Sequence, residues 1–140
     1  MTETTATVFA KRRPPIVIAE ESLEPLSDVA ESLLDVLPEV GHFLEDELTR
    51  ARLVPLRAMP RDVVTMNATV EFTLGQNERV ERRRLVYPAD CVVGDSCISI
   101  ASPAGVALLG LKEGQTMSWT SRHGELLSLK VLKVHPPSGH

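Results

Sequence analysis

A very short helix with a strand on either side is the feature that most constrains this chain. Ser102 is typical of a helix N-cap, and Pro103 of the first helical position, where a missing N–H costs nothing. Gly110 is typical of the residue just past a helix end. Two turns of helix span only about 10 Å and are not stable alone. We therefore expect this helix to pack on a sheet.

Alternating apolar and polar residues predict the strands of that sheet. Residues 68–74 and 79–87 alternate on either side of a GQN turn, which predicts a β-hairpin. Further strands are expected around Ile98, from Thr116 onward and over 126–134. About five antiparallel strands with one short helix on a face make an α+β fold.

Two amphipathic helices are predicted ahead of the sheet. Ser22 is the expected N-cap of the first, whose apolar stripe has helical spacing: Leu26, Ala30, Leu33 and Leu37. Pro38 and Gly41 are expected to stop this helix. A second stripe follows at the same spacing: Leu44, Leu48 and Ala51. Both stripes are buried only if the helices fold back on one another, which predicts a short antiparallel helical hairpin.

These patterns divide the chain into three parts. Residues 1–13 lack periodicity and are expected to be a disordered tail. The helical hairpin is assigned to 14–56, and the sheet domain to 57–140. A single small domain on a hairpin needs no partner subunit to bury its core, so we expect a monomer.

Charge is unevenly distributed along the chain. The formal net charge is -4 and the sequence pI is about 5.6. Residues 20–47 contain ten acidic residues and no Lys or Arg, whereas from Arg50 onward there are twelve basic and eight acidic residues. The sequence thus combines an acidic hairpin with a mildly basic body. A solvated helical surface explains most of the hairpin carboxylates.

Several function classes are disfavoured by composition. No apolar run is as long as a membrane span, and residues 1–13 have no signal-peptide core, so we expect a cytoplasmic protein with no membrane partner. Cys91 and Cys97 are expected to be free thiols in a reducing cytosol. The histidines are scattered without a ligand pattern, so no metal or other cofactor is expected.

Three ordered segments carry a resemblance to a known family. They are MPRDVVTMNATVEF (59–72), RRLVYPAD (83–90) and PAGVALLGLKEGQTMSW (103–119). Their order resembles the C-terminal FKBP-like domain of the bacterial GreA/GreB transcript-cleavage factors. The resemblance covers residues 14–134, with only the architecture matched in the hairpin. It implies an FKBP-like fold for the body and RNA polymerase as the partner.

The resemblance also implies where the partner binds. In that family the FKBP-like domain docks at the rim of the polymerase secondary channel, with the start of its short helix facing the polymerase. Carried onto this sequence, the implied polymerase-binding residues are Ala101, Ser102, Pro103 and Gly105.

Transcript cleavage is not expected. Gre factors reach the polymerase active site with a long coiled coil, whose tip carries two acidic residues that help to hold Mg²⁺ and activate water. In this chain the tip, residues 37–42, has Glu39 as its single acid. Asp35 lies one turn below it, and His42 follows. The hairpin is also roughly half as long as a Gre coiled coil, at 1.5 Å per residue.

The resulting interpretation is a non-enzymatic regulator. Its body would hold the channel rim while the blunt acidic hairpin occupies the entrance and excludes longer channel-binding factors. An FKBP-like prolyl isomerase is an alternative, but fold alone does not confer activity and the body offers few aromatic residues: Phe72, Tyr87 and Trp119. A nucleic-acid-binding module is another, resting on Arg79 and residues 82–84. Strand alternation separates Arg82 and Arg84 from Arg83, and no aromatic residues interleave with them for base stacking.

Overall fold

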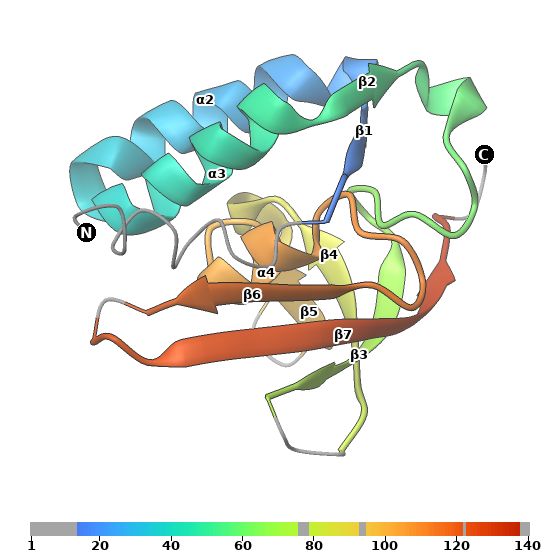
Figure 1. Cartoon of the computed structure of the whole chain (residues 1–140). Helices are drawn as coiled ribbons and strands as arrows, with labels where there is room; N and C mark the ends of the chain where they lie inside the picture. Colours follow the sequence, from blue (N-terminus) through green and yellow to red (C-terminus); the bar gives the residue numbers. More distant parts are fainter. Residues whose placement is uncertain (1–13, 76–78, 93–94, 122, 138–140) are drawn as a thin grey trace.

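A helical layer packs over one face of a curved β-sheet (Figure 1). The computed structural model describes residues 14–75, 79–92, 95–121 and 123–137, so the predicted tail over 1–13 lies outside the described residues. The helices α2 (Glu20–Val36) and α3 (Pro38–Arg50) lie side by side, and the short helix α4 (Pro103–Leu108) lies between them and the sheet. The predicted α+β fold with an N-terminal helical hairpin is confirmed.

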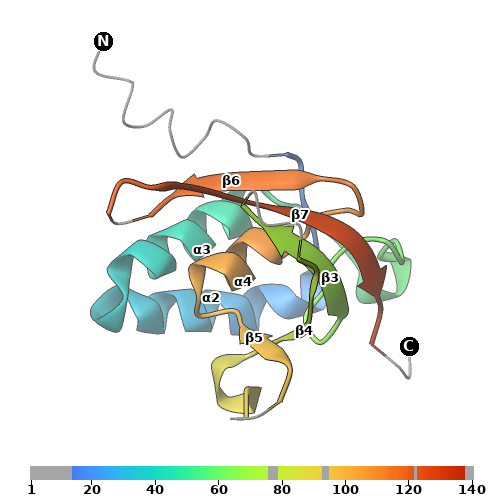
Figure 2. The same ribbon diagram turned by 90° about the horizontal axis from the view of Figure 1, so that it is seen from below.

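The main sheet has five strands in the order β5-β4-β3-β7-β6. Their bounds are Thr69–Leu74 for β3, Glu81–Val86 for β4, Cys97–Ser99 for β5, Thr116–Thr120 for β6 and Leu126–His135 for β7. Figure 2 shows the long β7 strand curving beside β3 and β6. Each predicted strand is present, with ends that shift by one or two residues.

One pairing in this sheet differs from the prediction. The strands β4 and β5 run parallel, whereas the other neighbouring pairs of the main sheet are antiparallel. The chain leaves β4, passes through the 3-10 turn η2 (Pro88–Asp90) and returns to the level of Arg84, in the second half of β4, where β5 begins. The sheet is therefore mixed, because the connection is a crossover rather than a hairpin.

A second, two-stranded sheet ties the two ends of the helical hairpin together. The strand β1 (Val17–Ala19) precedes α2, and β2 (Arg52–Val54) follows α3, and the two pair in parallel. A 3-10 turn, η1 (Leu56–Ala58), then leads into the body. The backbone N–H of Val17 also donates to the carbonyl of Gly110 at 3.3 Å, which links this small sheet to the end of α4.

The first helix begins earlier than predicted. It starts at Glu20, directly after β1, so Ser22 lies inside its first turn rather than capping it. The N-cap position is Ala19, whose side chain makes no capping hydrogen bond. The strand pairing of β1 fixes the entry of the chain into α2, so the local capping signal at Ser22 is not used.

The connection between the two helices is also tighter than predicted. It consists of Leu37 alone, and Pro38 opens α3 as its first residue. Gly41 was expected to end the first helix, but it lies inside α3, and this prediction is wrong. A Cβ at Gly41 would lie 3.0 Å from the carbonyl oxygen of Ala30 in α2. This glycine therefore serves the close approach of the two helices rather than a turn.

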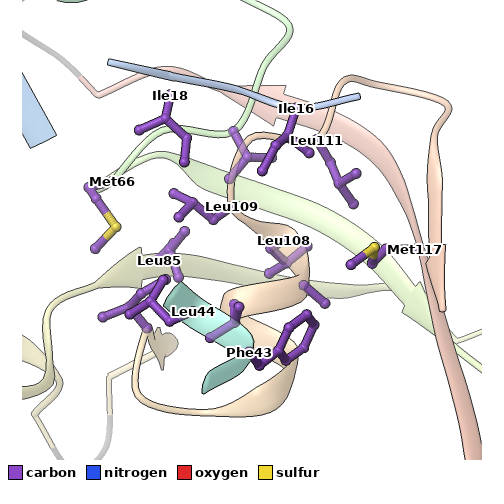
Figure 3. Close-up of a cluster of buried hydrophobic side chains, with 14 of the residues drawn as sticks. Ile16, Ile18, Phe43, Leu44, Met66, Leu85, Leu108, Leu109, Leu111 and Met117 are labelled. Carbon is purple, nitrogen blue, oxygen red and sulfur yellow. The ribbon is translucent and has the colours of Figure 1, made fainter. Parts of the chain in front are cut away.

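A single apolar core joins the hairpin to the sheet. Leu44 of α3, Leu85 of β4 and Leu108 of α4 are each fully buried within the same cluster (Figure 3). One charged residue, Glu47, is also buried, with an exposed fraction of 1%. The guanidinium of Arg50 donates to both of its carboxylate oxygens, at 2.8 and 2.9 Å. The hairpin thus lies on the body along its length and shares its core.

The two cysteines are not free thiols. Cys91 and Cys97 form a disulfide between the end of η2 and the first residue of β5. The crossover into β5 brings their Cα atoms to 5.7 Å, inside the range a disulfide spans. The spacing of the two residues in the sequence does not reveal this approach, and the prediction from the expected compartment is wrong for this structure.

The helices of the described segments are too short or too polar to cross a lipid bilayer.

Candidate functional site

The start of α4 is held by a compact hydrogen-bond network around Ser102. As predicted, Ser102 is the N-cap, and its Oγ accepts from the backbone N–H of Gly105 at 3.1 Å. The same hydroxyl donates to the carbonyl of Ser99 at 2.7 Å, and the Oγ of Ser99 accepts from the N–H of Ala101 at 2.9 Å. Both ends of the turn are therefore fixed by side chains, and Pro103 is left exposed as the first helical residue.

Gly105 has a structural role in this turn, because it allows the helix and the preceding strand to approach closely. It is buried, and a Cβ there would lie 2.1 Å from the carbonyl oxygen of Ser99. No side chain fits such a gap without moving the backbone. Gly105 therefore lets α4 sit directly on the end of β5 and so places Ser102 and Pro103, while its own surface is covered.

The hairpin tip lies beside this turn. Glu39 and Val40, in the first turn of α3, line the same groove as Ala101, Ser102 and Pro103. The groove has a volume of about 400 Å³. The rest of its lining has an apolar part, Leu37, Phe43, Trp119 and Leu127, and a polar part, Thr120, Ser121 and His123. The structure thus brings one of the predicted tip residues, Glu39, to the same surface as Ala101, Ser102 and Pro103.

Two of the predicted tip residues do not line the groove. Asp35 is exposed on the last turn of α2. His42 is also exposed, with its Nδ1 3.6 Å from a carboxylate oxygen of Glu45. Within the described ranges, no three His, Cys, Asp or Glu residues come close enough together to hold a metal ion.

The floor of the groove contains an aromatic pair. The rings of Phe43 and Trp119 are 6.4 Å apart between centroids, with planes inclined by 34°. Trp119 is 3% exposed, and its indole Nε1 has no hydrogen-bond partner in the described part of the chain. The Oγ1 of the neighbouring Thr120 is also buried without a partner there. Buried donors are normally paired, so these two polar atoms are exceptions among the described side chains.

Sequence reasoning did not find this groove. It considered Trp119 only as one of the few aromatic residues of the body, and it gave no role to Phe43 or Leu127. These residues come from α3, β6 and β7, and only the packing of the hairpin on the body brings them together. Of the other two aromatic residues considered for an isomerase pocket, Phe72 is fully buried in the core. Tyr87 lines a different hollow, and burial raises the pKa of its phenol.

The comparisons with known proteins agree with the architecture of this site. The family model described as "Transcription elongation factor, GreA/GreB, C-term" matches residues 59–136, which include β3 to β7 and α4. The chain belongs to the GreA/GreB family. This GreA/GreB family member is also 34% identical over 122 residues to the "Regulator of nucleoside diphosphate kinase" of Escherichia coli (strain K12), covering 87% of this chain and 90% of that protein.

Two further relatives define the range of the similarity. A solved structure, "Prokaryotic transcription elongation factor GreA/GreB from Nitrosomonas europaea", is 35% identical, with a TM-score of 0.69 over 86% of this chain and 99% of that one. The "Transcription elongation factor GreA" of Azorhizobium caulinodans is 28% identical over 91 residues, 65% of this chain and 57% of its own length. This family member is thus matched over nearly its whole length by the shorter relatives and over part of a longer one.

Proposed function

We propose that this GreA/GreB family member is a transcription regulator that binds RNA polymerase at the rim of the secondary channel. It docks through the groove between the α3 tip and the start of α4, and it excludes longer factors that use the same channel. It does not stimulate transcript cleavage itself. Membership of the GreA/GreB family supports RNA polymerase as the partner. The docking surface, the competition with longer factors and the lack of cleavage are inferred from the geometry of the groove and the hairpin.

The observation that carries the proposal is the groove itself. A rigid turn presents Pro103 at its edge, an apolar wall runs to Leu37, and Phe43 and Trp119 line the groove. An apolar side chain of a partner would fill it. Well-packed apolar anchors with a few polar contacts are typical of protein interfaces.

The second line of support is the position of the hairpin. The 17 residues of α2 give a rod of about 25 Å at 1.5 Å per residue. Its buried residues belong to the core shared with the body, so the hairpin is not a free arm. A blunt end of this kind fits occupation of a channel entrance rather than delivery of an acid pair to a distant active site.

A binding assay with core RNA polymerase tests the docking surface. We expect Pro103→Ala together with Ser102→Ala to weaken binding at least about tenfold, because a central interface contact is worth more than about 1 kcal/mol. Pro88→Ala is the matched control, since Pro88 is an exposed proline that opens a different turn, η2. Equal affinity for the paired variant and the control would exclude this surface.

A second pair of variants tests the hairpin side of the groove. Leu37→Asp places a charge on the groove wall, while Val36→Asp places the same charge one residue away on a side chain that is 70% exposed. We expect Leu37→Asp alone to reduce polymerase binding. The competitive mechanism is checked by displacement of a GreA-type factor from polymerase, and the absence of cleavage by assaying a stalled complex. Failure to displace the factor at saturating protein would exclude the competition.

A further inference from the structure

The outer face of the sheet, turned away from the helices, is rich in cations. Strand pairing places Arg82 opposite Glu71 and Arg84 opposite Thr69, and on the other side of β3 it places Lys133 opposite Glu71. Directly opposed residues share a face, and this face is the one opposite to the buried Val70 and Phe72. Lys130 lies on it as well, opposite Thr73. One carboxylate thus faces four permanent cations in the described part of this surface.

One end of this face is hollowed. Asn67, Thr69, Arg82, Arg84 and His135 line a hollow of about 510 Å³, together with Pro136 and Pro137 at the end of the described chain. Asn67 has a left-handed φ of 72°, a conformation that asparagine tolerates in turns. The walls are mainly polar, and none of the lining residues is Phe, Tyr or Trp, so the hollow suits a charged group rather than a lipid tail.

The positive charge in the hollow is only partly balanced. One oxygen of Glu71, Oε2, serves two partners: Nε2 of His135 at 2.7 Å and NH1 of Arg82 at 3.2 Å. The Arg82 side chain is still 63% exposed. The guanidinium of Arg84 is exposed and has no hydrogen bond or ion pair with the described residues. The guanidinium groups of Arg82 and Arg84 are therefore both available to an anion. The carboxylate that competes with the anion is that of Glu71, which Arg82 shares with His135.

We propose that this hollow binds phosphate groups. Arg82 and Arg84 are two residues apart on one strand, so their Cα atoms are separated by about 6.6 Å along it. Each guanidinium is a planar fork whose donors match the oxygens of a phosphate, and arginine is the residue of choice for this chemistry. A ligand with adjacent phosphoryl groups would engage both forks. The phosphates belong either to a free diphosphate-containing molecule or to a nucleic-acid backbone. In both cases the site recognises the phosphates and not the identity of a base.

Isothermal titration with inorganic pyrophosphate at low ionic strength tests this site, because salt screens exposed charges. We expect Arg84→Ala and Arg82→Ala each to weaken binding about tenfold, the loss of one bidentate contact. Arg52→Ala is the matched control, since it removes the same charge from an exposed position on β2, outside the hollow. Absence of pyrophosphate binding, or equal loss in the Arg52 variant, would overturn the proposal.

A gain-of-affinity variant removes the ambiguity of a folding defect. Glu71→Gln removes the carboxylate charge that Arg82 and His135 share. We expect this variant to bind pyrophosphate several-fold more tightly, because the anion no longer competes with Glu71 for the Arg82 guanidinium. A misfolded protein would not show such a gain. Unchanged or weaker binding by this variant, with native circular dichroism, would contradict the assigned role of Glu71.

A single-stranded oligonucleotide distinguishes the two sources of phosphate. Tight binding that falls steeply with salt and is lost in Arg84→Ala identifies nucleic acid as the source. Pyrophosphate binding with no tighter binding of the oligonucleotide identifies a free diphosphate-containing molecule. The paired Ser102→Ala and Pro103→Ala variant should keep wild-type pyrophosphate affinity, because these residues line a different hollow. The phosphate site therefore stands or fails independently of polymerase docking.

Discussion

The helical hairpin and the outer face of the sheet form opposite layers of the molecule, and their charges are opposite in sign (Figure 1). The hairpin exposes a row of carboxylates: Glu20, Glu21, Glu24, Asp28, Glu31, Asp35, Glu39 and Asp46. The outer sheet face exposes Arg82, Arg84, Lys130 and Lys133. The net charge of -4 averages two surfaces that would attract different partners. A low pI therefore says little about a local cationic site.

The two layers also differ in how they are stabilised. The hairpin is held by apolar packing on the body and by one buried ion pair, whereas the outer sheet face depends on exposed cross-strand pairs. Buried contacts are worth several times more than exposed ones. Substitutions that separate the layers should therefore have large effects on stability, and those on the sheet face should have small ones.

The largest effect is expected from Leu44→Ala. Leu44 is fully buried in α3, and its removal leaves a cavity where the hairpin meets the body. We expect a loss of about 3 kcal/mol in the free energy of unfolding, measured by urea denaturation. Val36→Ala, on a side chain that is 70% exposed, should change it by less than about 0.5 kcal/mol. Similar values for the two variants would mean that the hairpin is not anchored through Leu44.

Arg50→Ala tests the buried ion pair of the acidic layer. It removes both guanidinium hydrogen bonds to Glu47, which is 1% exposed, and the contact of Arg50 with the carbonyl of Pro14. Leaving a buried carboxylate without its cation destabilises a protein by about 3 kcal/mol, reduced here because Arg50 itself is partly exposed. Arg52→Ala is the control on an exposed arginine two residues later. A double Glu47→Gln and Arg50→Ala variant should recover part of the loss.

Reduction of the disulfide tests the edge of the sheet layer. Cys91 and Cys97 close a short loop at the start of the edge strand β5, and loop closure of this size is worth about 2 kcal/mol in the entropic account. We expect a dithiol reductant, or Cys91→Ser with Cys97→Ser, to lower the thermal midpoint by several degrees. The serine variant treated with reductant serves as the control. An unchanged midpoint would mean that the disulfide does not stabilise β5.

The smallest effect is expected from the pH dependence contributed by Glu71. The hydrogen bond from His135 lowers the pKa of the Glu71 carboxyl from its ordinary value, helped by the charges of His135, Arg82 and Lys133 and opposed by desolvation. A depressed pKa contributes stability above the unfolded-state pKa and loses it as the pH falls through the folded-state pKa. We expect wild type to lose slightly more stability than Glu71→Gln between pH 6 and pH 3, in urea titrations at each pH. A larger acid loss in the variant would contradict this assignment.

The predictable parts of the fold are those specified within one turn or one strand. Ser102, Pro103 and Gly110 specified α4 because a cap, a first-turn proline and a left-handed residue, with φ of 81° here, act through the local backbone. The separation of Arg82 and Arg84 from Arg83 followed from strand alternation and agrees with the observed register.

The parts that sequence reasoning missed depend on contacts between distant segments. Helix α2 starts at Glu20 because β1 pairs with β2, a strand more than thirty residues later. Gly41 resembles a turn residue until the approach of Ala30 is known. The groove over Trp119 and the meeting of Cys91 with Cys97 likewise need the assembled layers. None of these contacts leaves a periodic signal in the sequence.

The one-residue connection at Leu37 has a consequence for how such a hairpin could change in length. Because α2 and α3 meet there without a loop, matched heptad insertions before and after Leu37 would continue both apolar stripes and leave the body untouched. Each matched pair would carry the tip about 10 Å further, beyond the end of the sheet. Reach is thus set at one joint, and because Leu37 and Glu39 also line the groove, a longer hairpin would lose its own side of that docking surface.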